Sequence, residues 1–294
     1  MGKPDSDNVY TACWNAWDLL LNVRGIGWNW SQGLVVPKPA FKTNSRVIFV
    51  LLSAVAFIFH AVALDVCVQA IRVLSPGIVD SPAGGTLFDH TLPPFLELLR
   101  AILVTFLTGA AIYFGLQHTY HLLGIVCVIL FQQHPSHWPP PFDIPLFSTS
   151  LNELWGRRWH QMMRDAVLNL GYHPLSRLFG RFVGLLGAFL VSGVFHSFDL
   201  EQHRSGYVVV CLVFWVMNSV GVALERLWKK ATGREVRGVW GWVWTAGWLF
   251  LCGVPMVDVY ARVGRLTALR VVGGFEPSLA IIALVRRVAR LWLG

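Results

Sequence analysis

The chain has 294 residues, of which 55% belong to the apolar and aromatic set and only 14% carry charge. A soluble domain carries about 25% charged residues, so this composition excludes a soluble globular protein. It also excludes a disordered chain, which needs low hydrophobicity and high charge. We therefore predict an all-α polytopic membrane protein with roughly 5–8 transmembrane helices and additional interfacial amphipathic helices.

The formal net charge is +8, from 24 basic and 16 acidic residues. The basic residues flank apolar runs, so we attribute the charge to membrane topology and predict no nucleic-acid partner. The five cysteines are scattered without a CxxC pair and are interpreted as small core residues rather than a disulfide framework. Residues 1–10 are polar and no apolar stretch follows them, so no signal peptide is expected.

Five apolar runs are candidates for helices that cross the membrane, because a bilayer core of about 30 Å needs about 20 residues in a helix. They lie between Arg46 and Arg72, from Pro94 to Phe131, from Arg177 to Phe198, from Gly206 to about Leu227, and from about Trp240 to Tyr260. The second run is too long for one upright span, so it is either one tilted, protruding helix or two segments. A further run, Leu279 to Val285, is too short and too basic to be counted with them.

The distribution of arginine and lysine orients these runs. Basic residues gather in residues 1–45 and in the 132–176 and 228–239 loops, whereas the 75–94 loop holds none and the 199–205 loop holds only Arg204. We predict that the three basic segments are cytoplasmic, which favours a single crossing by the second run. Arg262, Arg265 and Arg270 then fall on the opposite side, so either the fifth run is re-entrant or the tail is interfacial. Residues 1–45 form the N-terminal segment, and residues 46–294 form one membrane-embedded domain.

Residues 148–178, STSLNELWGRRWHQMMRDAVLNLGYHPLSRL, are predicted to form a cytoplasmic interfacial segment. Ser150 and Glu153 fit a capping box, so a helix is expected to begin there. Apolar residues then recur at helical spacing from Leu151 to Met163, with Trp155 and Trp159 on one face. This pattern alone is typical of an amphipathic anchor that lies on the membrane. The HPSHWPPPFDIP stretch before it is expected to be extended, because three consecutive prolines exclude a helix.

His196 lies near the end of the 177–198 run, four residues after Ser192 and on the same helical face. An ionisable residue within a span suggests a functional site, although a neutral imidazole bonded to a neighbouring helix is an equally reasonable interpretation. The other polar residues in or near spans are interpreted as satisfied core or interface residues. They are His60, Asp65, Asn218 and Glu225.

Two HxxH pairs, His118 with His121 and His134 with His137, raise the question of a metal site. There is no HxxHH or HExxH cluster and no carboxylate arranged with these histidines, so we predict no metal. The sequence also lacks a GxSxG elbow, a phosphate-binding glycine loop and a CxxC pair. These absences give no support to serine catalysis or nucleotide hydrolysis.

Two motifs together resemble a known family. S-L-N-E-L-W-G-R-R-W-H, residues 150–160, is similar to the S-x-x-E-F-W-G-R-R-W-[HN] signature of the wax-synthase branch of the membrane-bound O-acyltransferases (MBOAT). V-S-G-V-F-H, residues 191–196, resembles the S-G-x-x-H motif of that superfamily, and residues 17–30 resemble the opening segment of its fungal members. The resemblance implies an MBOAT-like fold and transfer of an acyl group from acyl-CoA to an alcohol.

The resemblance also implies roles for particular residues. His196 matches the catalytic histidine, and His160 matches the second polar position of the family. Histidine suits a general base for an alcohol at neutral pH. Arg157 and Arg158 are candidates for binding the phosphates of CoA, with Trp159 and Asn152 beside them. Acyl-CoA, expected to be acetyl-CoA, is a co-substrate, and no tightly bound cofactor is predicted.

The function favoured by these observations is acetylation of a terpenoid-type alcohol by an integral protein of the endoplasmic reticulum, where membrane lipids surround it. The same-class alternative is a wax ester synthase that joins a fatty acyl group to a fatty alcohol. A transporter is the alternative from another class, but no repeated halves with paired, broken spans are visible. A membrane scaffold accounts for the spans but not for the two motifs.

Overall fold

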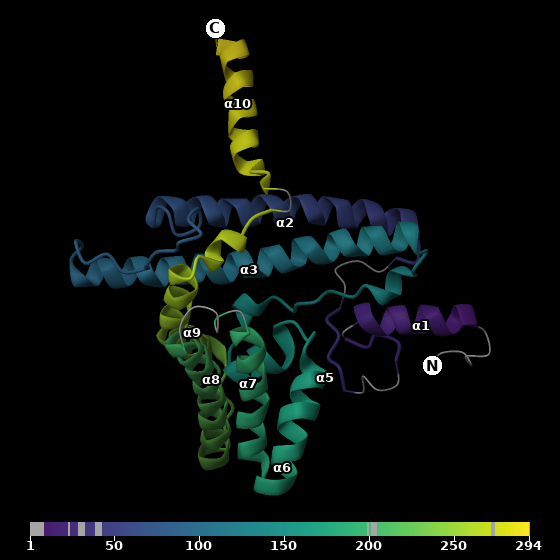
Figure 1. Ribbon diagram of the computed structural model, residues 1–294, viewed down its shortest axis with the longest axis vertical. Coiled ribbons are helices and arrows are strands. Elements are labelled where there is room, and N and C mark those ends of the chain that lie inside the picture. The colour runs from purple at the N-terminus through teal and green to yellow at the C-terminus, as the bar shows by residue number, and fades with distance from the viewer. Residues whose placement is uncertain are drawn as a thin grey trace. The chain divides into compact units, whose positions relative to one another are not determined.

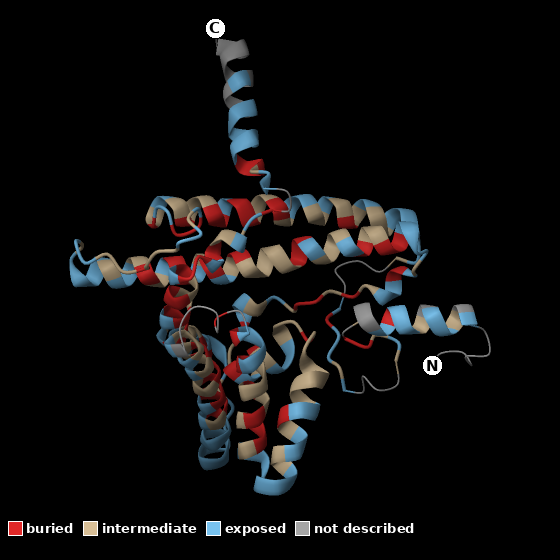
Figure 2. Ribbon diagram, viewed as in Figure 1, coloured by how far each residue is buried: buried red, intermediate tan, exposed pale blue. Residues whose placement is uncertain are grey.

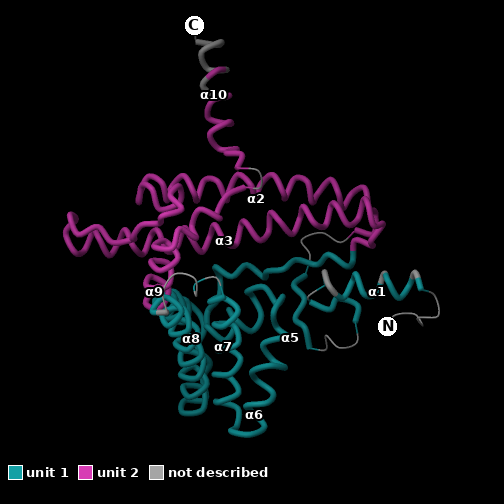
Figure 3. The backbone as a smooth tube through the Cα atoms, viewed as in Figure 1, with its two compact units in different colours: residues 1–42, 136–249 teal, residues 43–135, 250–294 magenta. Residues whose placement is uncertain are grey.

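The computed structural model describes residues 9–22, 24–28, 33–38, 43–198, 200, 205–271 and 274–293. Lys3, Lys42 and Arg204, which entered the charge analysis, lie outside these residues. Every regular element among the described residues is helical. Two compact units make up the chain: unit 1 holds residues 1–42 and 136–249, and unit 2 holds residues 43–135 and 250–294 (Figure 3).

Unit 2 is built on two long helices that run side by side, α2 (Arg46–Leu74) and α3 (Pro94–Leu130) (Figure 1). The prediction of one long helix over the second apolar run is confirmed, because α3 is continuous over 37 residues. At about 1.5 Å per residue it is about 55 Å long, so it must tilt in a bilayer or protrude from it. The Arg46 guanidinium donates to the Gln132 carbonyl oxygen and thereby ties the start of α2 to the end of α3.

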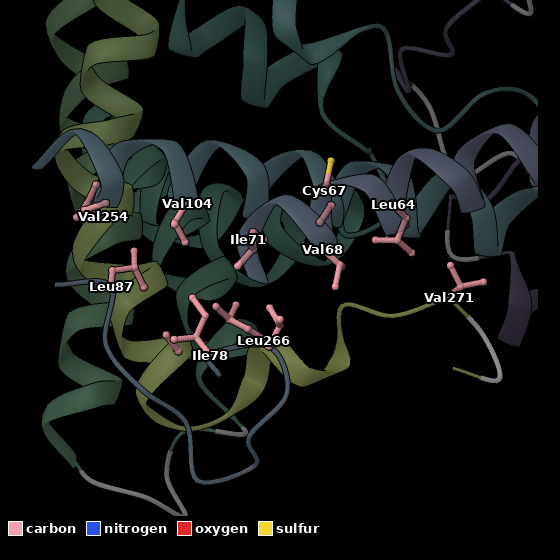
Figure 4. Close-up of a cluster of buried hydrophobic side chains, with 14 of the residues drawn as sticks. Leu64, Cys67, Val68, Ile71, Ile78, Leu87, Val104, Val254, Leu266 and Val271 are labelled. Carbon is pink, nitrogen blue, oxygen red and sulfur yellow. The ribbon is translucent and has the colours of Figure 1, made fainter. Parts of the chain in front are cut away.

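The core of unit 2 gathers side chains from both long helices and from distant parts of the chain (Figure 4). Ile71 of α2 and Val104 of α3 are fully buried, as is Leu87 of the loop between these helices. Val254 and Leu266 add apolar surface from the C-terminal part of the chain. Burial of these aliphatic side chains stabilises the packing of the 75–93 loop and of the C-terminal segment that carries Val254 and Leu266 against the helix pair.

Two of the three arginines that fit the charge rule poorly are paired with carboxylates. Arg262 contacts Asp258 at 2.6 Å, and Arg270 contacts Asp80 at 3.2 Å. Arg72 also contacts Asp80, at 2.8 Å. These ion pairs reduce the net positive charge at this end of the helix pair, which explains how it tolerates several arginines.

The C-terminal helix α10 (Pro277–Leu293) is longer than the apolar run that predicted it. Its described side chains from Leu279 to Leu284 are mostly exposed (Figure 2). The buried carboxylate of Asp65 in α2 accepts hydrogen bonds from the Ser278 backbone N–H and hydroxyl, at 2.8 and 2.6 Å. Asp65 is thus satisfied, as predicted, and it caps the first turn of α10.

Unit 1 opens with α1 (Val9–Leu21), and a proline-rich loop then leads into several short elements. The loop contains η1 (Pro135–His137). The short elements that follow it are, in chain order, η2 (Pro145–Phe147), α4 (Leu151–Glu153), η3 (Leu154–Arg158), α5 (Arg164–Val167), η4 (Leu168–Tyr172) and α6 (His173–Phe179). Three longer helices follow: α7 (Arg181–Ser197), α8 (Ser205–Thr232) and α9 (Gly238–Arg262). The first half of α9 belongs to unit 1 and the second half, followed by η5 (Arg265–Ala268), to unit 2.

The expected span over 177–198 is shorter than predicted. Gly180 has a φ of +88° and separates α6 from α7, so residues 177–179 belong to α6. α7 keeps 17 residues, a length of about 26 Å. It packs closely on η4, since a Cβ at Gly171 would overlap the backbone of Gly187. Among the described residues, four helices are long and apolar enough to cross a membrane, namely α2, α3, α8 and α9, and α7 is a shorter apolar helix.

Candidate active site

The segment that carries the first motif is fixed at its start by two carboxylates. Ser150 Oγ accepts from the Glu153 backbone N–H at 3.0 Å, which confirms the predicted cap. The Glu153 carboxylate reaches back to Thr149 rather than to Ser150, with 2.8 Å to the Thr149 N–H. Burial raises the pKa of Glu153, but the hydrogen bonds from Thr149 and Arg158 outweigh it and hold that pKa below its usual value.

Glu225, from α8, supplies the second carboxylate. Its side chain is 7% exposed and accepts from the backbone N–H groups of Leu151 and Asn152, at 2.6 and 2.9 Å. It also accepts from the Trp244 indole of α9, at 2.9 Å. The sequence interpretation of Glu225 as a satisfied residue is confirmed. Its location adds a role, because it binds the orphan N–H groups at the start of the motif.

The motif does not continue as the amphipathic helix predicted to reach Met163. After α4 the backbone widens into one π-helical turn, η3, which closes with a 2.8 Å bond from the Trp159 N–H to the Leu154 carbonyl. Trp159 itself is extended, with φ −74° and ψ 156°, and so ends the helix. This break removes Trp159 and His160 from the helix surface and directs them to the loop that precedes the motif.

The loop has no helix over residues 138–144, as its prolines predict, but it is not extended throughout: η1 interrupts the stretch before it, and Ile144 has a φ of +42°. Phe142 packs edge-on against the rings of both Trp159 and His160, with centroids 5.0 and 5.7 Å apart. The buried guanidinium of Arg24 donates to the carbonyl oxygens of Pro139 and Pro140, at 2.7 and 2.9 Å. Arg24 therefore connects the N-terminal segment to the loop. Its charge placed Arg24 among the basic residues of a predicted cytoplasmic segment, but the sequence did not predict this contact.

The second motif reaches the same aromatic cluster from α7. The His196 ring stacks on Trp215 of α8, with centroids 4.8 Å apart and planes 14° apart. Trp215 lies 5.3 Å from Trp155, which lies 6.1 Å from Trp159. The Trp155 indole donates to Asn218 Oδ1 at 2.9 Å, and Asn218 is fully buried. Aromatic rings thus connect the two histidines, which are 36 positions apart in the chain.

Burial, with smaller contributions from the nearby His196 and Arg24, lowers the pKa of His160 to about 4. His160 is therefore neutral at physiological pH and accepts or donates hydrogen bonds as an uncharged ring. Its Nδ1 atom is buried and has no hydrogen-bond partner among the described residues. His196, by contrast, is exposed. One inner neutral histidine beside one accessible histidine is an arrangement that can bind a polar ligand group and exchange a proton with it.

The four residues expected to bind acyl-CoA have different environments. Arg158 is 20% exposed, contacts Glu153 at 2.7 Å and donates to the Asp143 carbonyl oxygen at 2.9 Å, so its charge already holds the loop. Arg157 is 59% exposed and pairs with Asp143 at 3.2 Å. The Asn152 side chain is exposed, and Trp159 is half-buried. Because Arg158 is already engaged by Glu153 and the loop, these contacts favour Arg157 as the residue that binds a phosphate. The acyl-CoA-binding roles of all four residues stay predictions.

Sequence reasoning assigned no role in the site to Phe142, Trp215, Asn218, Glu225 or Arg24. Asn218 and Glu225 were visible as polar residues in an apolar run, which is a recognised sign of function. Nothing in the local pattern of Phe142 or Trp215 distinguishes them from other aromatic residues in this chain. Within the part of the chain that the structure describes, no group of three histidine, cysteine, aspartate or glutamate residues lies close enough to hold a metal ion.

Comparison with known proteins places this site in a family context. Residues 138–216, which include both motifs, match the membrane bound O-acyl transferase family. Acetyltransferase aurG of Calcarisporium arbuscula is 27% identical over 224 residues, covering 68% of this chain and 52% of that protein. Acetyltransferase ple2 of Rhodocybe pseudopiperita is 26% identical over 80% of this chain and 63% of its own length. The long-chain-alcohol O-fatty-acyltransferase of Simmondsia chinensis is 38% identical over 132 residues, 38% of this chain and 37% of that protein.

The chain thus spans about half the length of the curated relatives that it matches. No solved structure matches it.

Proposed function

We propose that this chain belongs to the membrane bound O-acyl transferase family and transfers an acyl group from acyl-CoA to the hydroxyl of a lipophilic alcohol. One observation carries the proposal. His160 and His196, which come from the two family motifs, belong to one aromatic cluster in unit 1, in which the rings of Trp159, Trp155 and Trp215 connect them. Such a pair provides one group to exchange a proton and one to bind the developing charge.

In the proposed reaction His196 acts as the general base. An imidazole nitrogen of His196 takes the proton of the alcohol while the alcohol oxygen attacks the thioester carbonyl carbon. The tetrahedral intermediate then collapses, the carbon–sulfur bond breaks, and the proton on His196 passes to the CoA thiolate. The products are an ester and CoA, so protons balance and no covalent acyl-enzyme is needed. In this proposal neutral His160 donates a hydrogen bond to the oxyanion or positions the thioester.

The exposed guanidinium of Arg157 is the proposed ligand for a CoA phosphate, because it retains accessible donors beside Asp143. The segment that carries it, 132–176, is proposed to face the cytosol, where CoA is found. The basic residues of this segment support that orientation. We place the protein in the endoplasmic reticulum membrane, where a lipophilic alcohol is available from the bilayer.

For the substrate we propose acetyl-CoA and a terpenoid-type alcohol. The two fungal relatives that bear the name acetyltransferase align with more of this chain than the Simmondsia protein does, and this supports the short acyl group. A long acyl group with a fatty alcohol is the second candidate. It is favoured by the higher identity to the Simmondsia long-chain-alcohol O-fatty-acyltransferase across the motif region.

The test uses microsomes that contain the wild-type chain, His196→Ala or the control His90→Phe. They are incubated with labelled acetyl-CoA or palmitoyl-CoA, together with farnesol, a panel of cyclic terpenoid alcohols or hexadecanol. We expect labelled ester from the wild type and from the control, at a rate at least 100-fold above His196→Ala. The preferred donor and acceptor distinguish the two candidates. Ester formation that is equal in wild type and His196→Ala would overturn the assignment of His196.

A further inference from the structure

Unit 2 contains three histidines that the proposed reaction does not use. His60 is the central residue of the 29-residue helix α2, and His118 and His121 lie on the facing helix α3. The rings of His60 and His121 stack with centroids 5.3 Å apart, and His118 lies about one helical turn before His121 on α3. Both helices are candidate membrane spans, and His118 is about 18 Å from the end of α3. Ionisable residues so deep in a span are costly and therefore suggest a binding function.

The hydrogen-bond roles within this histidine cluster (His60, His118 and His121) are set by the backbone. His60 Nδ1 lies 2.6 Å from the Ala56 carbonyl oxygen, and His118 Nδ1 lies 3.3 Å from the Phe57 carbonyl oxygen. A carbonyl only accepts, so Nδ1 of each ring carries the proton. In each neutral ring Nε2 is then left with a lone pair that accepts a hydrogen bond.

At least one of these acceptors is buried without a partner. His118 is 1% exposed, and its Nε2 has no hydrogen-bond partner among the described residues. The neighbouring Gln117 is 8% exposed, and its Oε1 is likewise unsatisfied, while its amide donates to the Tyr113 hydroxyl at 3.3 Å. Leaving a buried acceptor unsatisfied costs free energy, so these atoms need a donor from outside the helix pair.

The surroundings restrict the chemistry of that donor. The His118 ring stacks on Phe57 at 4.1 Å, and Phe59 and Phe114 lie against His60 at 5.3 and 6.0 Å. An ammonium group would lose its hydration among these rings with no carboxylate in the cluster to compensate. A metal ion is disfavoured because no three potential ligands in the described chain lie at coordinating positions. A neutral hydroxyl on an apolar body satisfies the acceptors and suits the aromatic walls.

We infer that the α2–α3 helix pair binds the hydroxyl group of a lipophilic alcohol, with the Nε2 atom of His118 as the acceptor. The same chemistry is offered by two sources: a terpenoid or fatty alcohol, or a membrane sterol. Binding at this site is independent of the proposed acyl transfer, since it requires neither His196 nor acyl-CoA.

The experiment uses the full chain in phosphatidylcholine nanodiscs with an alkyne-tagged, photoreactive farnesol and its methyl ether. After irradiation, labelled peptides from residues 46–74 and 94–130 are quantified by mass spectrometry. We expect the alcohol to label them about five-fold more than the ether, a factor typical of one neutral hydrogen bond. Equal labelling by the alcohol and the ether in the wild type would overturn the proposal and indicate that water satisfies His118.

Variants locate the acceptor. His118→Phe keeps the ring stack on Phe57 but removes Nε2, so the preference for the alcohol should disappear. His118→Gln keeps an acceptor and should retain part of the preference. His90→Phe, at an exposed site outside the cluster, and His196→Ala should both label like the wild type. A preference that survives in His118→Phe would contradict the assignment to this residue.

Competition separates the two sources. Unlabelled farnesol, hexadecanol and cholesterol are added in separate reactions at equal concentration. Stronger competition by a linear alcohol identifies an acyl acceptor as the ligand, and stronger competition by cholesterol identifies a sterol. Failure of all three to compete would overturn the proposal, because a hydroxyl site must be saturable.

Discussion

Replacing Glu225 with alanine removes the acceptor that three N–H groups share at the start of the first motif. The Leu151 bond is buried and 2.6 Å long, whereas the Asn152 and Trp244 bonds, both 2.9 Å, are only partly buried. Alanine leaves all three donors without a carboxylate. In Glu225→Gln one oxygen remains, so the amide can still accept from one or two of the donors.

The magnitude follows from the burial of each donor. A fully buried, unsatisfied N–H costs about 3 kcal/mol at the upper end, and the two partly buried donors cost about 1 kcal/mol or less each because water can reach them. The three losses share one carboxylate and are not fully additive. We expect Glu225→Ala to destabilise the protein by about 4 kcal/mol and Glu225→Gln by about 2 kcal/mol. At about 2 °C per kcal/mol for a chain of this size, Tm should fall by about 8 °C and about 4 °C.

The assay is thermal unfolding in nanodiscs, followed by tryptophan fluorescence and by loss of acyl transfer. Glu235→Gln is the matched control, because Glu235 is exposed and its ion pair is with Lys229, which is also exposed. Its Tm should equal that of the wild type. A Tm for Glu225→Ala within 2 °C of the wild type would refute the reasoning. So would equal losses in the alanine and glutamine variants, since the retained oxygen would then have no effect.

Further predictions concern the motif and its aromatic cluster. Arg158→Ala should lower stability by about 2 kcal/mol, because it removes the donor that Glu153 Oε1 and the Asp143 carbonyl oxygen share. Arg157→Ala should leave Tm unchanged but raise the KM for acyl-CoA, and an unchanged KM would remove its proposed role. Asn218→Leu should cost about 2 kcal/mol by leaving the Trp155 indole unsatisfied; adding Trp155→Phe should recover part of this loss, and a fully additive double variant would show that the two residues are not coupled. As pH falls from 6.5 to 4, the unfolded chain binds a proton that buried His160 resists, so wild-type Tm should fall more steeply than that of His160→Asn; parallel pH profiles would show that His160 is not the group responsible.

Several features of the fold follow from the sequence with few assumptions. The length of the apolar run after Pro94 left one helix or two segments open, the charge pattern favoured a single crossing, and α3 is one helix. Asp65, Asn218 and Glu225 were interpreted as satisfied residues, and each makes the hydrogen bonds that burial demands. The Ser150 cap was visible because capping depends on residues three positions apart.

Two predictions about helices were wrong, and both failures have a tertiary cause. Helical spacing from Leu151 to Met163 predicted a continuous helix, but η3 ends it where Trp159 and His160 pack on Phe142. The 177–198 run was expected to be one span, but Gly180 ends α6 and a new helix begins at Arg181. The periodicity of apolar residues indicates which face of a helix would be buried. It does not indicate where the helix ends when that end is set by contacts with a loop distant in the sequence.

The sequence by itself determined the membrane class, the long helices and the two motifs, because these depend on composition, apolar length and short-range spacing. Only the tertiary structure decided that Trp215 and Phe142 connect those motifs, that Glu225 holds the first of them, and that His60, His118 and His121 meet in the other unit. These contacts join residues from separate helices or from a helix and a distant loop. They depend on how the helices pack against one another, a property that no local pattern in the sequence encodes.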